Sequence, residues 1–133
     1  MKKLLPVLLS LLVLTGCSPE ALPAGMDEEA VIAAGQEIVN LLVDGEYEEV
    51  LSRFREDVAA ATSAEEIKAL MEDAAGDAGA YRDREDAMAT GRTVDGVTYG
   101  EAVILGKFER ATILFRVAFD SDWNFVGLEI TEQ

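Results

Sequence analysis

Apolar residues recur every three or four positions between Asp27 and about Val43, and this spacing predicts an amphipathic helix. Residues 27–29 are all acidic and occupy the first turn, where the helix dipole favours negative charge. Asp44 and Gly45 follow the last apolar residue. We expect Gly45 to end the helix in the left-handed conformation that glycine adopts without steric cost.

Two further helices are predicted before Gly76. The second begins near Glu46, and the pair Thr62-Ser63 separates it from the third. Ser63 and Glu66 form a capping-box pattern, which predicts that Ser63 is the N-cap. The apolar faces expected to be buried are Tyr47, Val50, Leu51, Phe54 and Val58 in the second helix, and Ile67, Leu70, Met71 and Ala74 in the third.

After Gly79 the apolar period changes from about 3.6 to 2, which is typical of strands. Residues 80–93 are rich in charge and predict an exposed edge strand. Three more strands are predicted, joined by short turns. Their bounds are Tyr99–Phe108, Thr112–Phe119 and Phe125–Thr131.

The order of these elements predicts an α+β fold. About three N-terminal helices should pack on one face of a curved antiparallel sheet of about four strands. We expect the alternating set Ile113, Phe115, Val117 and Phe119 to face the helices. In the last turn, Asp120–Asn124, we expect Asn124 to take positive φ.

The N-terminus carries a targeting signal. Two lysines precede the apolar run Leu4–Leu14, which is too short to span a bilayer. The sequence Leu14-Thr15-Gly16-Cys17 resembles the bacterial lipobox, in which the chain is cut before a cysteine that carries diacylglycerol. This implies a cleaved signal peptide over residues 1–16 and a lipid-anchored tether over residues 17–26. The alternative is an ordinary signal peptide with a chance cysteine.

Charge and composition restrict the function of the remaining domain, residues 27–133. The chain has a formal net charge of −15, and removal of residues 1–16 with their two lysines makes it −17. Such a surface disfavours nucleic acid and anionic headgroups. The chain has no histidine and one cysteine, so Ser-His-Asp and Cys-His catalysis and histidine zinc sites are excluded. We expect no cofactor.

The chain resembles the DUF3887 family within the NTF2-like (cystatin-like) superfamily. The resemblance spans nearly all of residues 27–131. The segments that carry it are Leu41–Tyr47, Phe54, Ser63–Ile67, Gly79–Tyr81, Val117–Asp120 and Phe125–Leu128. It implies a secreted or lipid-anchored location and a sheet that curves around the first helix to form a cone. Trp123 departs from the family, whose last hairpin usually has glycine there.

Candidate site residues have two interpretations each. Six residues could line the core or a pocket within the cone: Phe54, Met71, Tyr81, Phe115, Val117 and Phe119. Trp123 is either an exposed partner contact or packed back on the sheet. Asp120, Asp122 and Asn124 have calcium-loop spacing, but the glycine and glutamate that an EF-hand then requires are absent, so a hairpin turn is favoured.

Three functions are compatible with the sequence. The first is a lipid-anchored extracytoplasmic module, non-catalytic, that binds a small ligand or envelope partner or pairs with a second copy. The outward set Thr112, Leu114, Arg116 and Ala118 would allow a homodimer through the open sheet face. The second is an enzyme that uses carboxylates and tyrosines such as Tyr47, Tyr81 and Tyr99. The third is a structural envelope lipoprotein.

Overall fold

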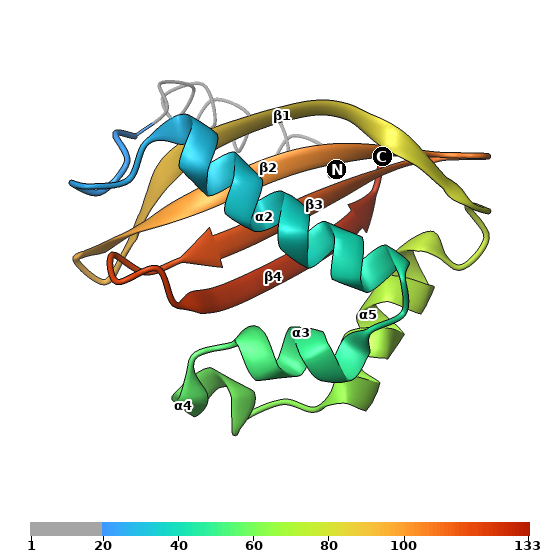
Figure 1. Ribbon diagram of the computed structural model, residues 1–133, viewed down its shortest axis with the longest axis horizontal. Coiled ribbons are helices and arrows are strands. Elements are labelled where there is room, and N and C mark those ends of the chain that lie inside the picture. Colours follow the sequence, from blue (N-terminus) through green and yellow to red (C-terminus); the bar gives the residue numbers. More distant parts are fainter. Residues whose placement is uncertain (1–19) are drawn as a thin grey trace, which may run out of the picture.

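The computed structural model describes residues 20–133, in which four helices precede four strands (Figure 1). The helices are α2 (Glu28–Val43), α3 (Tyr47–Arg53), α4 (Glu56–Ala59) and α5 (Ala64–Ala75). The strands are β1 (Tyr81–Val94), β2 (Val97–Phe108), β3 (Thr112–Phe119) and β4 (Phe125–Glu132). The predicted α+β fold is confirmed, with four helices in place of about three. The expected signal peptide over residues 1–16 lies outside the described residues.

Each strand pairs antiparallel with the next along the chain, so the sheet order is β1-β2-β3-β4 and the sheet is open. Figure 1 shows α2 running across one face of the curved sheet, while α3, α4 and α5 lie together on the β4 side. No helix between Glu20 and Gln133 has the length and hydropathy needed to cross a bilayer. Membership of the NTF2-like superfamily stays a prediction.

The core lies between α2 and the sheet. Ile113, Phe115, Val117 and Phe119 are all buried on the side of α2, which confirms the predicted alternation in β3. From the helix, Val31, Ile38, Val39 and Leu42 are buried against them. Asp27 caps α2 through its side chain, which accepts a hydrogen bond of 2.8 Å from the Ala30 N–H. Gly45 has a φ of +76°, as predicted for a helix end.

Gly35 lets α2 approach the sheet closely. A Cβ at this position would lie 2.6 Å from the Cβ of Ala102 and 3.2 Å from the Cδ1 of Ile104. Both residues belong to β2 and are fully buried. Glycine is normally unfavourable inside a helix, so its place here reflects packing rather than helix propensity.

The predicted second helix is interrupted at Phe54, which was expected to continue its apolar face. Phe54 is extended, with φ −66° and ψ 148°, and its ring stacks on Phe125 with a centroid separation of 3.9 Å. The next residue, Arg55, donates its backbone N–H to the Phe125 carbonyl at 2.8 Å. These contacts with β4 replace helical hydrogen bonds, so the segment divides into α3 and α4.

Helix α5 begins after Ser63, whose hydroxyl accepts a hydrogen bond from the Glu66 N–H at 3.1 Å. This confirms Ser63 as the N-cap. The predicted buried face is correct for Ile67 and Met71 but wrong for Leu70, which is 41% exposed. Ala75 is buried instead, because α5 contacts the rest of the protein along a narrow stripe.

The segment Glu20–Met26 is fastened to the sheet. The Glu20 carbonyl accepts a hydrogen bond from the Gly91 N–H at 2.9 Å, and the Glu20 carboxylate accepts one from the Thr93 hydroxyl at 2.6 Å. Met26 is buried, with its sulfur close to Gly100. From Glu20 onward the expected tether therefore contacts the domain, and residues 17–19 lie outside the described part.

We expect Gly35→Ala to destabilise the protein by about 1–3 kcal/mol, because the added methyl group collides with Ala102 in a filled core. Elsewhere in a helix this substitution stabilises by about 1 kcal/mol. Thermal and urea unfolding measure the effect. The double variant Gly35→Ala/Ala102→Gly should recover part of the loss, since the colliding Cβ is removed. An increase in stability for Gly35→Ala alone would contradict the close contact.

Candidate functional site

A buried carboxylate lies on the sheet face opposite α2. Glu101 in β2 is 5% exposed and is the one buried charged residue among residues 20–133. Its two carboxylate oxygens each accept from an arginine: Oε2 from Arg92 Nη1 at 3.2 Å, and Oε1 from Arg116 Nη1 at 3.4 Å. Arg116 also lies 3.6 Å from the carboxylate of Glu129. These four side chains form a continuous ion network across the sheet.

Strand register produces this network. Glu101 is the pairing partner of Thr90 in β1 and of Ala118 in β3. Arg92 and Arg116 are each two residues from those partners and therefore point to the same face of the sheet, at diagonal positions that long side chains can span. Each carboxylate oxygen of Glu101 accepts a hydrogen bond from a different arginine, and Glu101 therefore holds both guanidinium groups in place.

A pocket of about 370 Å³ opens over this network. Its floor includes Ala118 and Gly127, whose small size leaves space beside the larger side chains. Its lining includes both apolar and ionic side chains. The lining residues are Arg55, Val58, Arg92, Val94, Tyr99, Glu101, Arg116, Ala118, Val126, Gly127, Leu128 and Glu129.

Arg55 is fixed at the β4 rim of the pocket by two carboxylates. Its Nε lies 2.7 Å from Asp57 Oδ1, and its Nη1 lies 2.9 Å from Asp120 Oδ2. These hydrogen bonds raise the pKa of Arg55 further above its ordinary value. The hydrogen bond from Arg55 lowers the pKa of the exposed Asp57. The side chain is thereby held beside the sheet instead of extending into solvent.

Asp120 organises the β3–β4 turn. Its Oδ1 accepts hydrogen bonds from the backbone N–H groups of Asp122 and Asn124, which identifies the segment as a hairpin turn. Burial opposes ionisation of Asp120, but hydrogen bonds from Asn124, Arg55 and Asp122 outweigh it and lower its pKa. The predicted positive φ at Asn124 is wrong. Trp123 takes it instead, at +68°, because the Asn124 N–H turns inward to Asp120.

A second pocket of about 220 Å³ lies between α2, α5 and the β1–β2 pair. Two of the candidate tyrosines, Tyr47 and Tyr81, line it together with Met71 and Glu72. Burial, and next the negative charge of Glu72, raise the pKa of Tyr47, so its hydroxyl stays protonated and can donate. Glu72 itself is exposed.

The structure separates the six predicted lining residues. Phe115, Val117 and Phe119 are core, Met71 and Tyr81 line the second pocket, and Phe54 packs on Phe125. None of the six lines the pocket over Glu101. Sequence reasoning missed the network of Arg92, Glu101 and Arg116. A signal was present, since Glu101 and Arg116 are the charged residues within the apolar stretches of two neighbouring strands.

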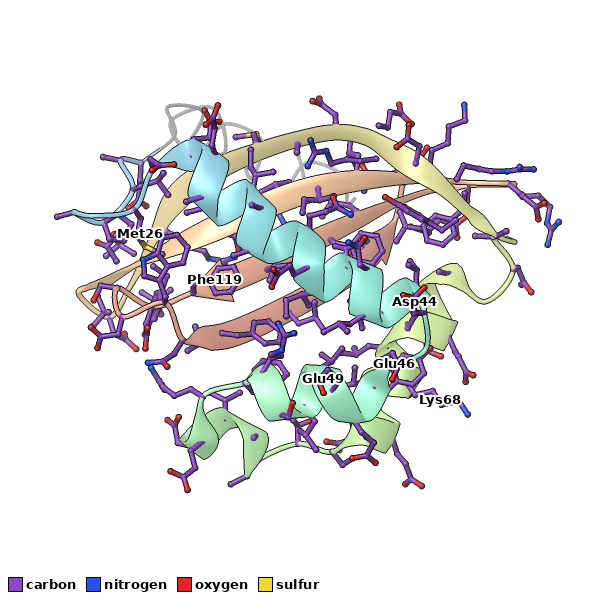
Figure 2. All side chains as sticks on the ribbon, in the orientation of Figure 1. Met26, Asp44, Glu46, Glu49, Lys68 and Phe119 are labelled. Carbon is purple, nitrogen blue, oxygen red and sulfur yellow. The ribbon has the colours of Figure 1, made fainter. Side chains whose placement is uncertain are left out.

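Trp123 is partly exposed and partly packed, and its role as a partner contact stays a prediction. It is 39% exposed, and its ring tilts against Phe119 with centroids 6.1 Å apart. The acidic residues at the α2–α3 junction, Asp44, Glu46, Glu48 and Glu49, are all exposed. Figure 2 shows three of them on the helical side of the molecule, apart from the sheet. They are solvated side chains, and no group of metal-ligating residues occurs within residues 20–133.

Comparison with known proteins identifies the family. A family model described as a protein of unknown function, DUF3887, matches residues 35–128. The chain belongs to the DUF3887 family. A second model, the prokaryotic membrane lipoprotein lipid attachment site, matches residues 1–18. The resemblance to a lipobox is therefore supported, and it implies membrane anchoring through lipid at Cys17.

One solved structure resembles the DUF3887 domain. It is the NMR structure of a protein from Ruminococcus gnavus ATCC 29149, with a TM-score of 0.71 and 24% identity. The match covers 83% of this chain and 96% of that chain. At this identity the likeness shows the fold alone. A search of the curated proteins gave no match.

We expect the stability of the Asp120→Asn variant to change less than that of the wild type as the pH falls into the acid range. Because folding lowers the pKa of Asp120, the unfolded chain binds the proton more readily. The Asp120 charge contributes its full stabilisation of the fold above the ordinary aspartate pKa of about 3.9. This contribution is lost as the pH falls through the lowered pKa that Asp120 has in the folded protein. The melting temperatures of wild type and variant should therefore differ at pH 7 and converge towards pH 3.

The control is Asp122→Asn, which removes an exposed charge from the same turn. Its melting temperature should follow that of the wild type at every pH. An equal difference between Asp120→Asn and wild type at pH 7 and pH 3 would contradict the role assigned to the Asp120 charge.

Proposed function

We propose that the protein is a lipid-anchored extracytoplasmic binding module, and that the pocket over Glu101 takes a small ligand with an anionic head and an apolar body. The observation that carries this is the gathering of Arg55, Arg92 and Arg116 beside apolar side chains in one hollow, in a chain of net charge −15. A pocket of this size is at the small end of the roughly 300–1,000 Å³ range of ligand sites.

The arrangement suits an anion despite the carboxylates nearby. Arg92 is half-exposed and donates only Nη1 to Glu101 among the described residues, so its other N–H groups face the pocket side or solvent. Planar guanidinium groups bind carboxylate and phosphate through paired hydrogen bonds. Glu101 acts as a positioning residue, because it orders both arginines before a ligand arrives and so reduces the entropy cost of binding.

Apolar groups define the other half of the ligand. Val58, Val94, Val126 and Leu128 line the same hollow and provide surface for a short hydrocarbon body. A fully charged ligand would leave these side chains without a partner. An amphiphilic anion uses both kinds of surface.

The enzyme alternative is favoured by one observation, the presence of both Tyr47 and Tyr81 in the lining of the second pocket. Tyr47 can donate a hydrogen bond there. The carboxylate beside it, Glu72, is exposed and lacks the burial that tunes a general acid or base. A second copy of the chain on the open sheet face is an alternative occupant of the first pocket, and light scattering with and without ligand would detect it.

Cys17→Ser should release the protein from membranes, because the acyl chains are its expected attachment. Fractionation of cells, with a carbonate wash and immunoblotting, measures the distribution. Ser18→Ala is the matched control and should remain in the membrane fraction. Protease treatment of intact cells or spheroplasts tests whether the domain faces outward. Retention of the Cys17→Ser protein with washed membranes would contradict anchoring through this residue.

Anionic ligands should bind the unlipidated Cys17→Ser protein in preference to neutral or cationic ones. The probes are hexanoate, hexyl phosphate, hexanol and hexylammonium, which share one apolar chain. Nitrogen-15 NMR titration should show saturable shifts at the amides of Glu101, Ala118 and Gly127 for the two anions. Arg92→Gln should weaken their binding about tenfold, the equivalent of about 1.4 kcal/mol.

Arg84→Gln makes the same charge change at the other end of β1 and should leave the affinity unchanged. Equal binding of hexanol and hexanoate, or equal effects of the two arginine variants, would contradict an anion site in this pocket.

A further inference from the structure

Three segments meet at one end of the molecule. These are the Glu20–Met26 segment, the β1–β2 turn at Asp95-Gly96, and the β3–β4 turn at residues 120–124. The register places them together, because Gly91, Gly100 and Phe119 are successive partners across β1, β2 and β3. Figure 1 shows all three at the left of the view. We refer to them together as the hairpin end.

The beginning of the described chain is held at the hairpin end. Glu20 forms an antiparallel bridge with Gly91, and its carboxylate accepts hydrogen bonds from the hydroxyl and the backbone N–H of Thr93. A side chain at position 91 would collide with the Ala21 carbonyl oxygen, so glycine is what allows the segment to cross β1. Thr93 is two residues from the tip of the β1–β2 turn.

Chain length brings this end to the membrane. Cys17 precedes Glu20 by three residues, which span at most about 11 Å even when fully extended. The acyl chains expected on Cys17 lie within the bilayer. Glu20, and the strand to which it is bound, must therefore lie close to the lipid headgroups.

The same end exposes apolar side chains. Val97 is 50% exposed and Trp123 is 39% exposed. Val94 borders the pocket over Glu101 and still leaves 46% of its surface exposed. These are three of the five large hydrophobic residues exposed in the described part, and they come from two different turns. Tryptophan is the residue most typical of the bilayer–water interface, where its ring is apolar and its N–H can hydrogen-bond.

The backbone at Trp123 adds a separate indication. Its φ of +68° is a conformation that favours glycine, and a bulky residue there carries a steric cost. The Trp123 ring lies at this turn, where one part packs against Phe119 and another part is exposed. The strain is consistent with a side chain that is retained for what it contacts.

We propose that the hairpin end is a membrane-contacting surface, and that Val94, Val97 and Trp123 enter the interfacial layer of the bilayer that holds the Cys17 lipid. The proposal rests on lipidation of Cys17 and goes beyond it, because a lipid anchor alone would leave the domain free to rotate. The contact is weak by itself, but the anchor keeps its local concentration high.

The charges at the hairpin end indicate which class of lipid it should contact. Asp95 and Asp122 lie in the same two turns and are exposed. Their carboxylates disfavour anionic headgroups, so the contact should be stronger on zwitterionic than on anionic lipid, and added salt should reduce that difference.

The sole tryptophan of the chain provides the test. The lipidated protein is placed in phosphatidylcholine vesicles, and attachment is measured by flotation. Trp123 emission should shift to shorter wavelength and be quenched by lipids brominated near the headgroup. The control is the double variant Trp123→Phe/Leu70→Trp, which moves the probe to an exposed position on α5 and should not be quenched.

A second pair of variants tests the valines. Val94→Ser/Val97→Ser should reduce Trp123 quenching severalfold while flotation stays complete, whereas Met88→Ser, an exposed change in the middle of β1, should not. Vesicles containing phosphatidylglycerol should quench less than phosphatidylcholine vesicles at low salt. Melting temperatures establish that each variant is folded.

The outcomes separate the contact from the anchor. Flotation without quenching of Trp123 would overturn the proposed contact and leave the lipid anchor intact. Failure of the wild-type protein to float would overturn both. Quenching of equal strength in the wild type and the Val94→Ser/Val97→Ser variant would also overturn the contact, because the valines would then take no part in it.

Discussion

The contact between Gly35 and Ala102 sets the distance between α2 and the sheet. With no side chain at position 35, the helix lies directly on β2, and the apolar residues on either side can interlock with those of β3. A filled core follows, in which Phe115 and Val117 have no exposed surface. The two pockets described above lie away from this contact, one on the open face of the sheet and one at the C-terminal end of α2.

On the face of the sheet opposite α2, ion pairs replace apolar packing as the main contacts. Within residues 20–133, α2 covers the other face, and ion pairs between neighbouring strands order the central residues of this one. A buried carboxylate is costly unless its charge is compensated, and Arg92 and Arg116 compensate Glu101 from both sides. The network thus makes the open face rigid and polar at its centre, with apolar side chains around the hollow. The order of the open face and the shape of the pocket on it both depend on the network of Arg92, Glu101, Arg116 and Glu129.

Local patterns were sufficient for most of the fold. The alternation from Ile113 to Phe119 and the capping signal at Ser63 depend on neighbouring residues, and both were predicted correctly. The break at Phe54 was missed, because it depends on stacking with Phe125, which lies 71 positions later in the chain. Leu70 was wrongly predicted to be buried. The sequence pattern shows which face of a helix is apolar, but it does not show how much of that face the rest of the protein covers.

The candidate site was less accessible to sequence reasoning. Glu101 and Arg116 become neighbours only when the β2–β3 register is known, and Arg55 reaches the pocket through contacts with β4 and the last turn. The positive φ at Trp123 was assigned to Asn124 because asparagine tolerates that conformation better. Hydrogen bonds to Asp120 decided between them, and such bonds cannot be read from composition.

The hydrogen bonds between Glu20 and β1 determine how far the domain can travel. With only three residues between the expected lipid on Cys17 and this attachment, the anchored domain cannot move far from the bilayer to sample distant molecules. Its encounters are confined to a layer of about one domain diameter above the bilayer, and it diffuses in two dimensions. A partner that is itself lipid-linked or embedded in the same leaflet shares that plane and meets the domain at high effective concentration. A molecule dissolved in the surrounding compartment must first come to the membrane surface.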